Sequence, residues 1–439
     1  MGTRLPQKLK VWSLSLGCPK NRVDSEHLLG SLGIAIESVA HMGRAQLVFI
    51  NTCGFIEPAV RESVRCIVDA VEHVGRCKKK PLLAVAGCLV GRYGAQPLAE
   101  ELPEVDLWLP TNDLASWPQR VAQALGLPLP EQGGAGRLLS TGPSYAWLKV
   151  GEGCRHHCAF CTIPSIRGGL ASVPAGEIVA EARSLLEHGV RELALVAQDL
   201  TSWGLDLGLK DPLPHLLEQL VDLKGLAWLR LLYLYPTGVT ETLLRCIRDF
   251  GPPLLPYLDI PMQHAHPGVL SRMGRPFARN PRQVLDLVRR FLPDAVLRTT
   301  FIVGYPGESE AHFADLCRFV EENRIQHVGV FAYAAEEGTK AALLPDQIPD
   351  AVKEERREHL MAIQAEVSAQ WLSTQVGSRQ QVLVDAPHPD WPGLHKGRVW
   401  FQAPEVDGIT YVSGPGVAPG AMLECDIVES ATYDLTALA

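Results

Sequence analysis

The sequence predicts an α/β fold in three parts: an N-terminal parallel α/β domain, a central partial (βα) barrel and a small C-terminal antiparallel β-barrel. Three observations lead to this prediction. Short apolar, β-forming runs alternate with segments of helical period from about residue 10 to 125, and six further strand candidates alternate with helical segments between residues 146 and 333. After Ser373 the chain changes to short β-forming runs broken by glycine and proline.

The bulk composition is that of a globular protein of more than one domain. The chain has 439 residues, of which 46% are hydrophobic and 21% charged. We expect no membrane span, and the early apolar run at residues 11–16 is too short for a signal-peptide core, so a cytoplasmic location follows. In a reducing compartment the 11 cysteines favour metal ligands or catalytic thiols over disulfides.

The N-terminal domain is expected to span residues 1–126. Its predicted strands are 11–16, 47–50 and 82–86, and an amphipathic helix at 59–74 lies between the last two. A stretch rich in proline and glycine, residues 127–143, predicts a linker.

The central domain is expected to span residues 144–372 and to close with a charged helix from Asp350 to Leu372. Parallel strands joined by helices carry their active sites at the carboxyl ends of the strands. The predicted strands are 146–150, 192–197, 228–233, 257–260, 297–303 and 328–333. Residues 373–439 form the C-terminal barrel, with predicted strands 381–384, 397–401, 409–412 and 422–427.

Three cysteines, Cys154, Cys158 and Cys161, follow the first strand of the central domain. Thiolates packed this tightly suit a cubane iron–sulfur cluster, and a set of three leaves one iron open to bind another molecule. Zinc and a buried structural trio are the alternatives, although a zinc knuckle normally brings four ligands in paired short spacings.

A second set, Cys18, Cys53 and Cys88, has one cysteine just after each predicted N-terminal strand. Both intervals are 35 residues, which is about the length of one βαβ step, so three parallel strands would deliver the thiols to one sheet edge. The spacing predicts a second cluster with an open iron. The alternative is three small residues buried at strand ends.

Polar residues and glycine also occur at the ends of the central strands. Gln198 and Gln263, with their neighbours Asp199 and His264, are expected to face the barrel mouth. There they would contact a cofactor or substrate; the alternative is that they form hydrogen bonds within the loops. Gly304 lets the backbone approach a cofactor or forms an ordinary turn.

The cysteine motif resembles the signature of the radical S-adenosylmethionine superfamily, CxxxCxxC, with an aromatic residue, here Phe160, before the last cysteine. The resemblance implies a 4Fe-4S cluster whose open iron binds S-adenosylmethionine. One electron then cleaves the cofactor to a deoxyadenosyl radical that removes hydrogen from an unactivated carbon. Chemistry of this difficulty requires a cofactor.

With the second cysteine set and the small barrel, the whole chain resembles the methylthiotransferases. This resemblance implies two 4Fe-4S clusters, the N-terminal one for sulfur delivery, with a methyl group from a second S-adenosylmethionine and a TRAM-like barrel that holds the macromolecular substrate. It identifies no sulfur donor or electron donor. The family's ribosomal branch modifies an aspartate of small-subunit ribosomal protein twelve, and this chain resembles it in the strings LGCPKNRVDSE, CTIPSIRG, VAQDLTSWG, YLDIPMQH, LRTTFIVGYPGE and APEVDG.

Charge also favours a protein substrate over RNA. Residues 373–439 carry three basic and eight acidic side chains, a net charge of −5, whereas an RNA-binding barrel should be basic. We therefore expect modification of ribosomal protein twelve, free or in the subunit, and no nucleic acid as the modified substrate. The alternatives are a transfer-RNA (adenosine) methylthiotransferase and a non-catalytic metal-binding ribosome-assembly factor.

The chain departs from the family pattern after Arg167. Gly169, Ala171 and Val173 stand where the family usually has basic residues. If those residues hold the cofactor's carboxylate or the substrate, Arg167 is the nearest replacement.

Overall fold

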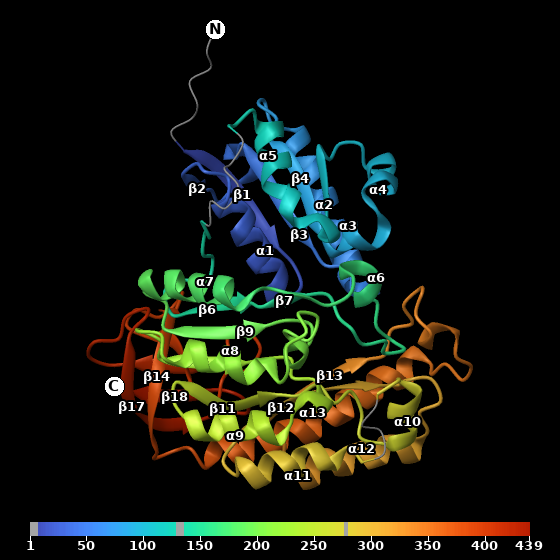
Figure 1. Cartoon of the computed structure of the whole chain (residues 1–439), viewed down its shortest axis with the longest axis vertical. Helices are drawn as coiled ribbons and strands as arrows, with labels where there is room; N and C mark the ends of the chain where they lie inside the picture. The colour runs from blue at the N-terminus through green and yellow to red at the C-terminus, as the bar shows by residue number, and fades with distance from the viewer. Residues whose placement is uncertain (1–7, 129–135, 276–279) are drawn as a thin grey trace. The chain divides into compact units, whose positions relative to one another are not determined.

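The computed structural model describes residues 8–128, 136–275 and 280–439, which form two compact units (Figure 1). Unit 1 contains the chain up to Ser140 together with the short segment Cys161–Gly169, and unit 2 contains Thr141–Phe160 and Leu170–Ala439. The central sheet and the C-terminal barrel therefore share one unit. The expected domain limits remain predictions, and residues 129–135 of the expected linker lie outside the described residues.

Unit 1 is built on a five-stranded parallel sheet in the order β2-β1-β3-β4-β5, which confirms the predicted N-terminal α/β fold. The strands are β1 (Leu9–Ser15), β2 (Ile36–Ser38), β3 (Leu47–Thr52), β4 (Leu82–Gly87) and β5 (Leu107–Pro110). The helices are α1 (Pro19–Gly30), α2 (Glu57–Gly75), α3 (Cys88–Tyr93), α4 (Ala95–Glu101), α5 (Trp117–Leu125) and α6 (Ile163–Arg167).

Helices cover both faces of this sheet. On one face Phe49 of β3 belongs to the same core as Trp117 of α5, and on the other Ile50 belongs to a core with Ile67 of α2. Successive strand residues point to opposite faces, and both faces are covered, so all six residues of β3 are buried. That is why the central strands of this sheet are continuous apolar runs with polar residues at their ends.

Unit 2 contains a six-stranded parallel sheet whose spatial order follows the chain, from β6 through β9, β10, β11 and β12 to β13. This confirms the six predicted βα steps. The strands are β6 (Tyr145–Lys149), β9 (Glu192–Val196), β10 (Trp228–Leu231), β11 (Leu254–Asp259), β12 (Val296–Val303) and β13 (His327–Ala332), with a small hairpin of β7 (Gly151–Glu152) and β8 (Ala171–Ser172). The helices are α7 (Ala175–Glu187), α8 (Pro212–Val221), α9 (Glu241–Phe250), α10 (Pro267–Arg272), α11 (Arg282–Phe291), α12 (Glu310–Asn323) and α13 (Asp350–Ser373).

The C-terminal barrel is closed and has five strands, one more than the sequence predicted. They are β14 (Arg379–Pro387), β15 (His395–Val399), β16 (Thr410–Ser413), β17 (Met422–Ser430) and β18 (Leu435–Leu438). The additional strand is β18, which pairs with β17 in the expected antiparallel sense but with β16 in parallel. The other three pairings of the barrel are antiparallel. The parallel pairing closes the barrel.

Buried charged side chains join this barrel to the beginnings of the central strands. Glu192, the first residue of β9, accepts hydrogen bonds from Arg230 Nε at 2.6 Å and from Arg398 Nη1 of β15 at 2.5 Å. None of the three side chains is more than 4% exposed. Burial alone would raise the pKa of Glu192, but the two guanidinium groups hold it below its usual value.

A second group of buried contacts joins the barrel to β11, β12 and β13. Asp407 of the barrel accepts a hydrogen bond from Tyr257 Oη at 2.6 Å and lies 3.4 Å from Arg298 Nε. His327, the first residue of β13, bonds through Nε2 to the carbonyl oxygen of Phe401 at 2.8 Å. The barrel is thus attached where the strands begin, which leaves the carboxyl ends of the strands for chemistry.

Among the described residues, no helix is both long enough and apolar enough to cross a membrane.

Glu192→Gln should destabilise unit 2 by about 3–5 kcal/mol, because buried Arg230 loses its carboxylate and buried Arg398 keeps only that of Asp385. Calorimetric melting measures the loss. Glu424→Gln, on the exposed face of β17, is the control and should change stability by less than about 0.5 kcal/mol. Equal melting temperatures of the parent chain and Glu192→Gln would show that the contacts of Glu192 with Arg230 and Arg398 do not stabilise the unit.

Candidate active site

The N-terminal cysteines lie at one edge of the unit 1 sheet, where β1, β3 and β4 end. Cys18 precedes α1, Cys53 follows β3, and Cys88 is the first residue of α3. The loops pack closely: a Cβ atom on Gly17 would come within 2.9 Å of Cys53 Sγ, and the positive φ of Gly17 is one that side chains rarely adopt. Gly17 therefore lets the first cysteine loop lie against the second.

The electrostatics of the three thiols also show that they are neighbours. Burial raises the pKa of Cys88 to about 11, Arg167 opposes that rise, and the charge of Cys18 adds to it. Burial likewise raises the pKa of Cys53; a backbone hydrogen bond at Phe55 opposes the rise, and Cys18 reinforces it. Thiols that are costly to ionise when alone become good ligands once a cation is present, because the metal takes the place of the proton.

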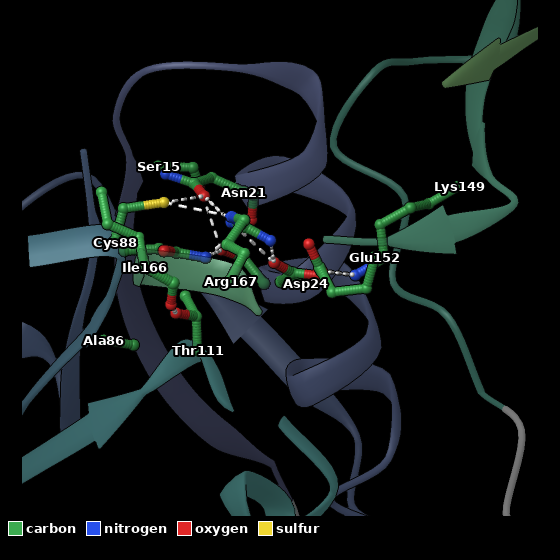
Figure 2. Close-up of polar contacts among 12 residues, drawn as sticks. Ser15, Asn21, Asp24, Ala86, Cys88, Thr111, Lys149, Glu152, Ile166 and Arg167 are labelled. Carbon is green, nitrogen blue, oxygen red and sulfur yellow. Dashed lines mark hydrogen bonds and ion pairs between the residues drawn. The ribbon is translucent and has the colours of Figure 1, made fainter. Parts of the chain in front are cut away.

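Asn21, which is completely buried, connects the cysteine loops (Figure 2). Its Nδ2 donates to the carbonyl oxygens of Leu16 at 2.8 Å and Thr52 at 3.0 Å, which end the strands before Cys18 and Cys53. Its Oδ1 accepts a hydrogen bond from Arg167 Nη2 at 2.5 Å. The same Oδ1 also accepts from Cys88 Sγ at 3.7 Å, so this one amide contacts all three cysteine loops.

Arg167 also belongs to this group. Its Nε donates to Cys88 Sγ at 3.2 Å, and its Nη1 and Nη2 lie 3.4 Å from Asp24 Oδ2 (Figure 2). The side chains of Arg167 and Asp24 are 1% and 2% exposed. The sequence suggests Arg167 as a ligand of the cofactor or substrate, which stays a prediction; in the structure its guanidinium contacts Cys88 and Asn21.

The second cysteine motif begins in unit 2 and continues into unit 1. Cys154 and Cys158 belong to unit 2, whereas Cys161 is the first residue of the segment that folds with unit 1. Cys154 Sγ accepts a hydrogen bond from the His156 backbone at 3.4 Å, and Cys158 Sγ accepts one from Arg275 Nη1 at 3.4 Å. Donors of this kind are typical neighbours of cluster-binding thiolates.

A stack of three side chains supports the cysteine loop in unit 2. The ring of His156 lies on that of Tyr235, with centroids 3.7 Å apart, and Arg275 covers the same tyrosine at 4.4 Å. His156 Nε2 also bonds to Asp199 Oδ2 at 2.7 Å. Nothing in the sequence singles out His156, Tyr235 or Arg275 as a group. Their long sequence separation left no spacing pattern that could have identified the stack.

Gln198 and Gln263 each keep one buried acceptor without a hydrogen-bond partner among the described residues, the side-chain oxygen Oε1. Gln198 Nε2 donates to Glu152 Oε1 at 2.7 Å. Gln263 has a φ of 72° but its backbone still bridges to β12. Buried acceptors without partners are costly, so both are suited to a ligand that donates hydrogen bonds, such as an ammonium or amino group.

The other candidates have partners within unit 2. Gly304 donates to both carboxylate oxygens of Glu308 at 3.1 Å, and a Cβ atom there would come within 2.3 Å of Lys353 Cγ, so this glycine serves the packing of α13. His264 Nδ1 accepts from the His266 backbone, which leaves Nε2–H directed at Glu308 Oε2, 3.3 Å away. Phe160 packs against the apolar cluster around Met273.

The donor chemistry of both cysteine sets fits an iron–sulfur cluster. Among the described residues, no three His, Cys, Asp or Glu side chains are arranged to hold a single metal ion. A cluster makes a different demand, because each thiolate binds a different iron and the sulfurs lie farther apart. Each set supplies three thiolates, and hydrogen-bond donors lie beside Cys88, Cys154 and Cys158.

Sequence profiles of known families match the three parts of the chain. The uncharacterized protein family UPF0004 matches residues 10–110, the Radical SAM superfamily residues 148–320 and the TRAM domain residues 376–439. These matches follow the three parts expected from the sequence.

Curated relatives match over nearly the full length. A protein of Nitratidesulfovibrio vulgaris described as ribosomal protein uS12 methylthiotransferase RimO is 64% identical, over 98% of this chain and 100% of that protein. Proteins with the same description from Oleidesulfovibrio alaskensis and Aquifex aeolicus are 59% and 44% identical. They cover 98% and 97% of this chain, and 100% and 96% of their own lengths.

Among solved structures, the radical S-adenosylmethionine methyltransferase TsrM from Kitasatospora setae has a similar fold. The form with tryptophan and a cofactor analogue bound gives a TM-score of 0.56 at 12% identity, over 82% of this chain and 89% of that one. The form with cobalamin and a 4Fe-4S cluster gives 0.53, over 89% and 81%.

Asn21→Ala should weaken iron retention by about 10- to 100-fold at the N-terminal cysteines, because the loops lose the amide that connects them. Iron and sulfide analysis after gel filtration measures the effect. Asn323→Ala removes a buried amide that bonds to the Phe319 carbonyl oxygen in unit 2, and should leave iron retention unchanged. If both variants retain iron equally, Asn21 does not organise the site.

Proposed function

The chain belongs to the family of ribosomal protein uS12 methylthiotransferases, and from this we propose that it attaches a methylthio group to the β-carbon of an aspartate in that ribosomal protein. It is a radical S-adenosylmethionine enzyme that uses an iron–sulfur cluster. The observation that carries the assignment is identity of 44–64% over nearly the whole chain.

We further propose two 4Fe-4S clusters, one at Cys154, Cys158 and Cys161 and one at Cys18, Cys53 and Cys88. When bound, these groups and S-adenosylmethionine supply the hydrogen-abstracting radical, the sulfur and the methyl group. Convergence of three thiols at one sheet edge, one of them buried and two partly buried, joined by Asn21, supports the second cluster. A cysteine that only fills space at a strand end would not need two other cysteines and a shared amide beside it.

The residues of unit 2 have the task of holding the cofactor. Gln198 Oε1 and Gln263 Oε1 are suited to accept hydrogen bonds from the amino groups of S-adenosylmethionine. The stack of His156, Tyr235 and Arg275 fixes the loop that carries Cys154 and Cys158, and Arg275 contributes a positive charge beside Cys158. Gly304 and Phe160 support this site through packing.

The barrel is proposed to dock the basic ribosomal protein. Asp385, Glu405, Asp407 and Asp434 are used in contacts within unit 2. The carboxylates of Asp390, Glu424, Asp426 and Glu429 are exposed, and the last three lie along β17. An acidic strand attracts a basic protein and repels RNA phosphates. We place the reaction in the cytoplasm, where ribosomal subunits are assembled.

Product mass tests the substrate. Anaerobically reconstituted enzyme, given S-adenosylmethionine, sulfide and a reductant, should increase the mass of uS12 by one methylthio group in place of one hydrogen, located at an aspartate. Transfer RNA, offered separately, should remain unchanged. Methylthioadenosine in RNA without modified uS12 would contradict the proposal.

Replacement of each cysteine set separates the clusters. The triple variant Cys18→Ala, Cys53→Ala, Cys88→Ala should lose about half of the iron and all methylthio transfer, yet still release deoxyadenosine on reduction. Replacing Cys154, Cys158 and Cys161 should abolish deoxyadenosine release and retain the half of the iron that the N-terminal cysteines bind. Iron content unchanged by the first replacement would refute the two-cluster proposal, and no deoxyadenosine from the parent chain would point to a non-catalytic binding protein.

A further inference from the structure

The segment that carries Arg167 contacts the loops that follow the second and third cysteines of unit 1. Thr162 Oγ1 donates to the carbonyl oxygen of Phe55, two residues after Cys53, at 3.1 Å. The carbonyl oxygen of Ile166 accepts from Thr111 Oγ1, at the end of β5, at 2.8 Å. A Cβ atom on Gly91, three residues after Cys88, would lie 2.9 Å from that same carbonyl oxygen. The segment is therefore packed directly onto the cysteine edge.

Arg167 points into this edge rather than to solvent, and each nitrogen of its guanidinium has an acceptor in unit 1. Nε bonds to Cys88 Sγ, Nη2 bonds to Asn21 Oδ1, and Nη1 lies near Asp24. The planar fork of arginine fixes the Nε–H direction once the other two nitrogens are held. Asn21 and Asp24 thus aim one donor at the sulfur of Cys88.

We infer that Arg167 is a positioning residue of the N-terminal cluster, which orients the Cys88 thiolate and keeps a positive charge beside it. The inference rests on the proposed second cluster and goes beyond it, because it assigns a task to a residue outside both cysteine sets. The reduced form of a cluster carries one more negative charge than the oxidised form. A buried cation that donates to a ligand sulfur stabilises the reduced form and raises the reduction potential.

The experiment uses the full chain with Cys154→Ala and Cys158→Ala, which removes the other cluster and leaves the segment from Cys161 to Arg167 unchanged. This parent is reconstituted with iron and sulfide, and the N-terminal cluster is titrated with dithionite under electron paramagnetic resonance. Arg167→Met and Arg167→Lys are made in it. Arg137→Met is the matched control, because the Arg137 side chain is 5% exposed and pairs with Glu26 at 2.7 Å in the same unit.

Arg167→Met should lower the ratio of reduced to oxidised cluster at a fixed potential about tenfold, equivalent to about 59 mV for a one-electron couple. Arg167→Lys should recover part of the shift because it restores the charge but not the fork. Arg137→Met should lower the melting temperature comparably and leave the potential unchanged.

Two results would overturn the inference alone: an unchanged potential in Arg167→Met, or an equal shift of the potential in Arg167→Met and Arg137→Met. A parent chain that assembles no cluster at all, with Arg167 intact, would refute the proposed second cluster and the inference with it.

Discussion

The chemistry of this chain depends on a constraint of parallel sheets: all strands end at the same edge. In unit 1 three strand ends bring together residues 18, 53 and 88, which no local folding could do. In unit 2, Gln198 and Gln263 likewise follow the carboxyl ends of β9 and β11. Hydrophobic burial on both faces fixes the strand order, and the strand order fixes which side chains meet.

The opposite ends of the central strands have a different task. There, Glu192, Tyr257, Arg298 and His327 contact the C-terminal barrel through buried charges and hydrogen bonds. Burying so many charges is costly unless each is paired, and a network of this kind specifies a single docking position more than it adds stability. In the six-stranded sheet of unit 2, one edge therefore holds the C-terminal barrel and the opposite edge is left for the reaction.

Much of this arrangement could be predicted because the information is local. The alternation of strands and helices, the interval of 35 residues and the CxxxCxxC motif are all visible in the sequence. The sequence missed β18, a four-residue strand whose pairing with β16 depends on closure of the barrel. It also missed the stack on Tyr235 and the contacts of Arg167, which join residues far apart in the chain. Such contacts follow from tertiary packing, which leaves no periodic trace.

The segment Cys161–Gly169 has a consequence for where this protein can be divided. A boundary drawn near residue 140 separates two family profiles, yet a fragment ending there would lack Thr162, Ile166 and Arg167. The carbonyl oxygen of Phe55 would lose its donor, Thr111 Oγ1 would lose its acceptor, and Asp24 would lose its contact with the Arg167 guanidinium. The amino-terminal part is therefore a unit of sequence but not of folding. Gene fission or modular exchange at this point would have to carry the short segment along.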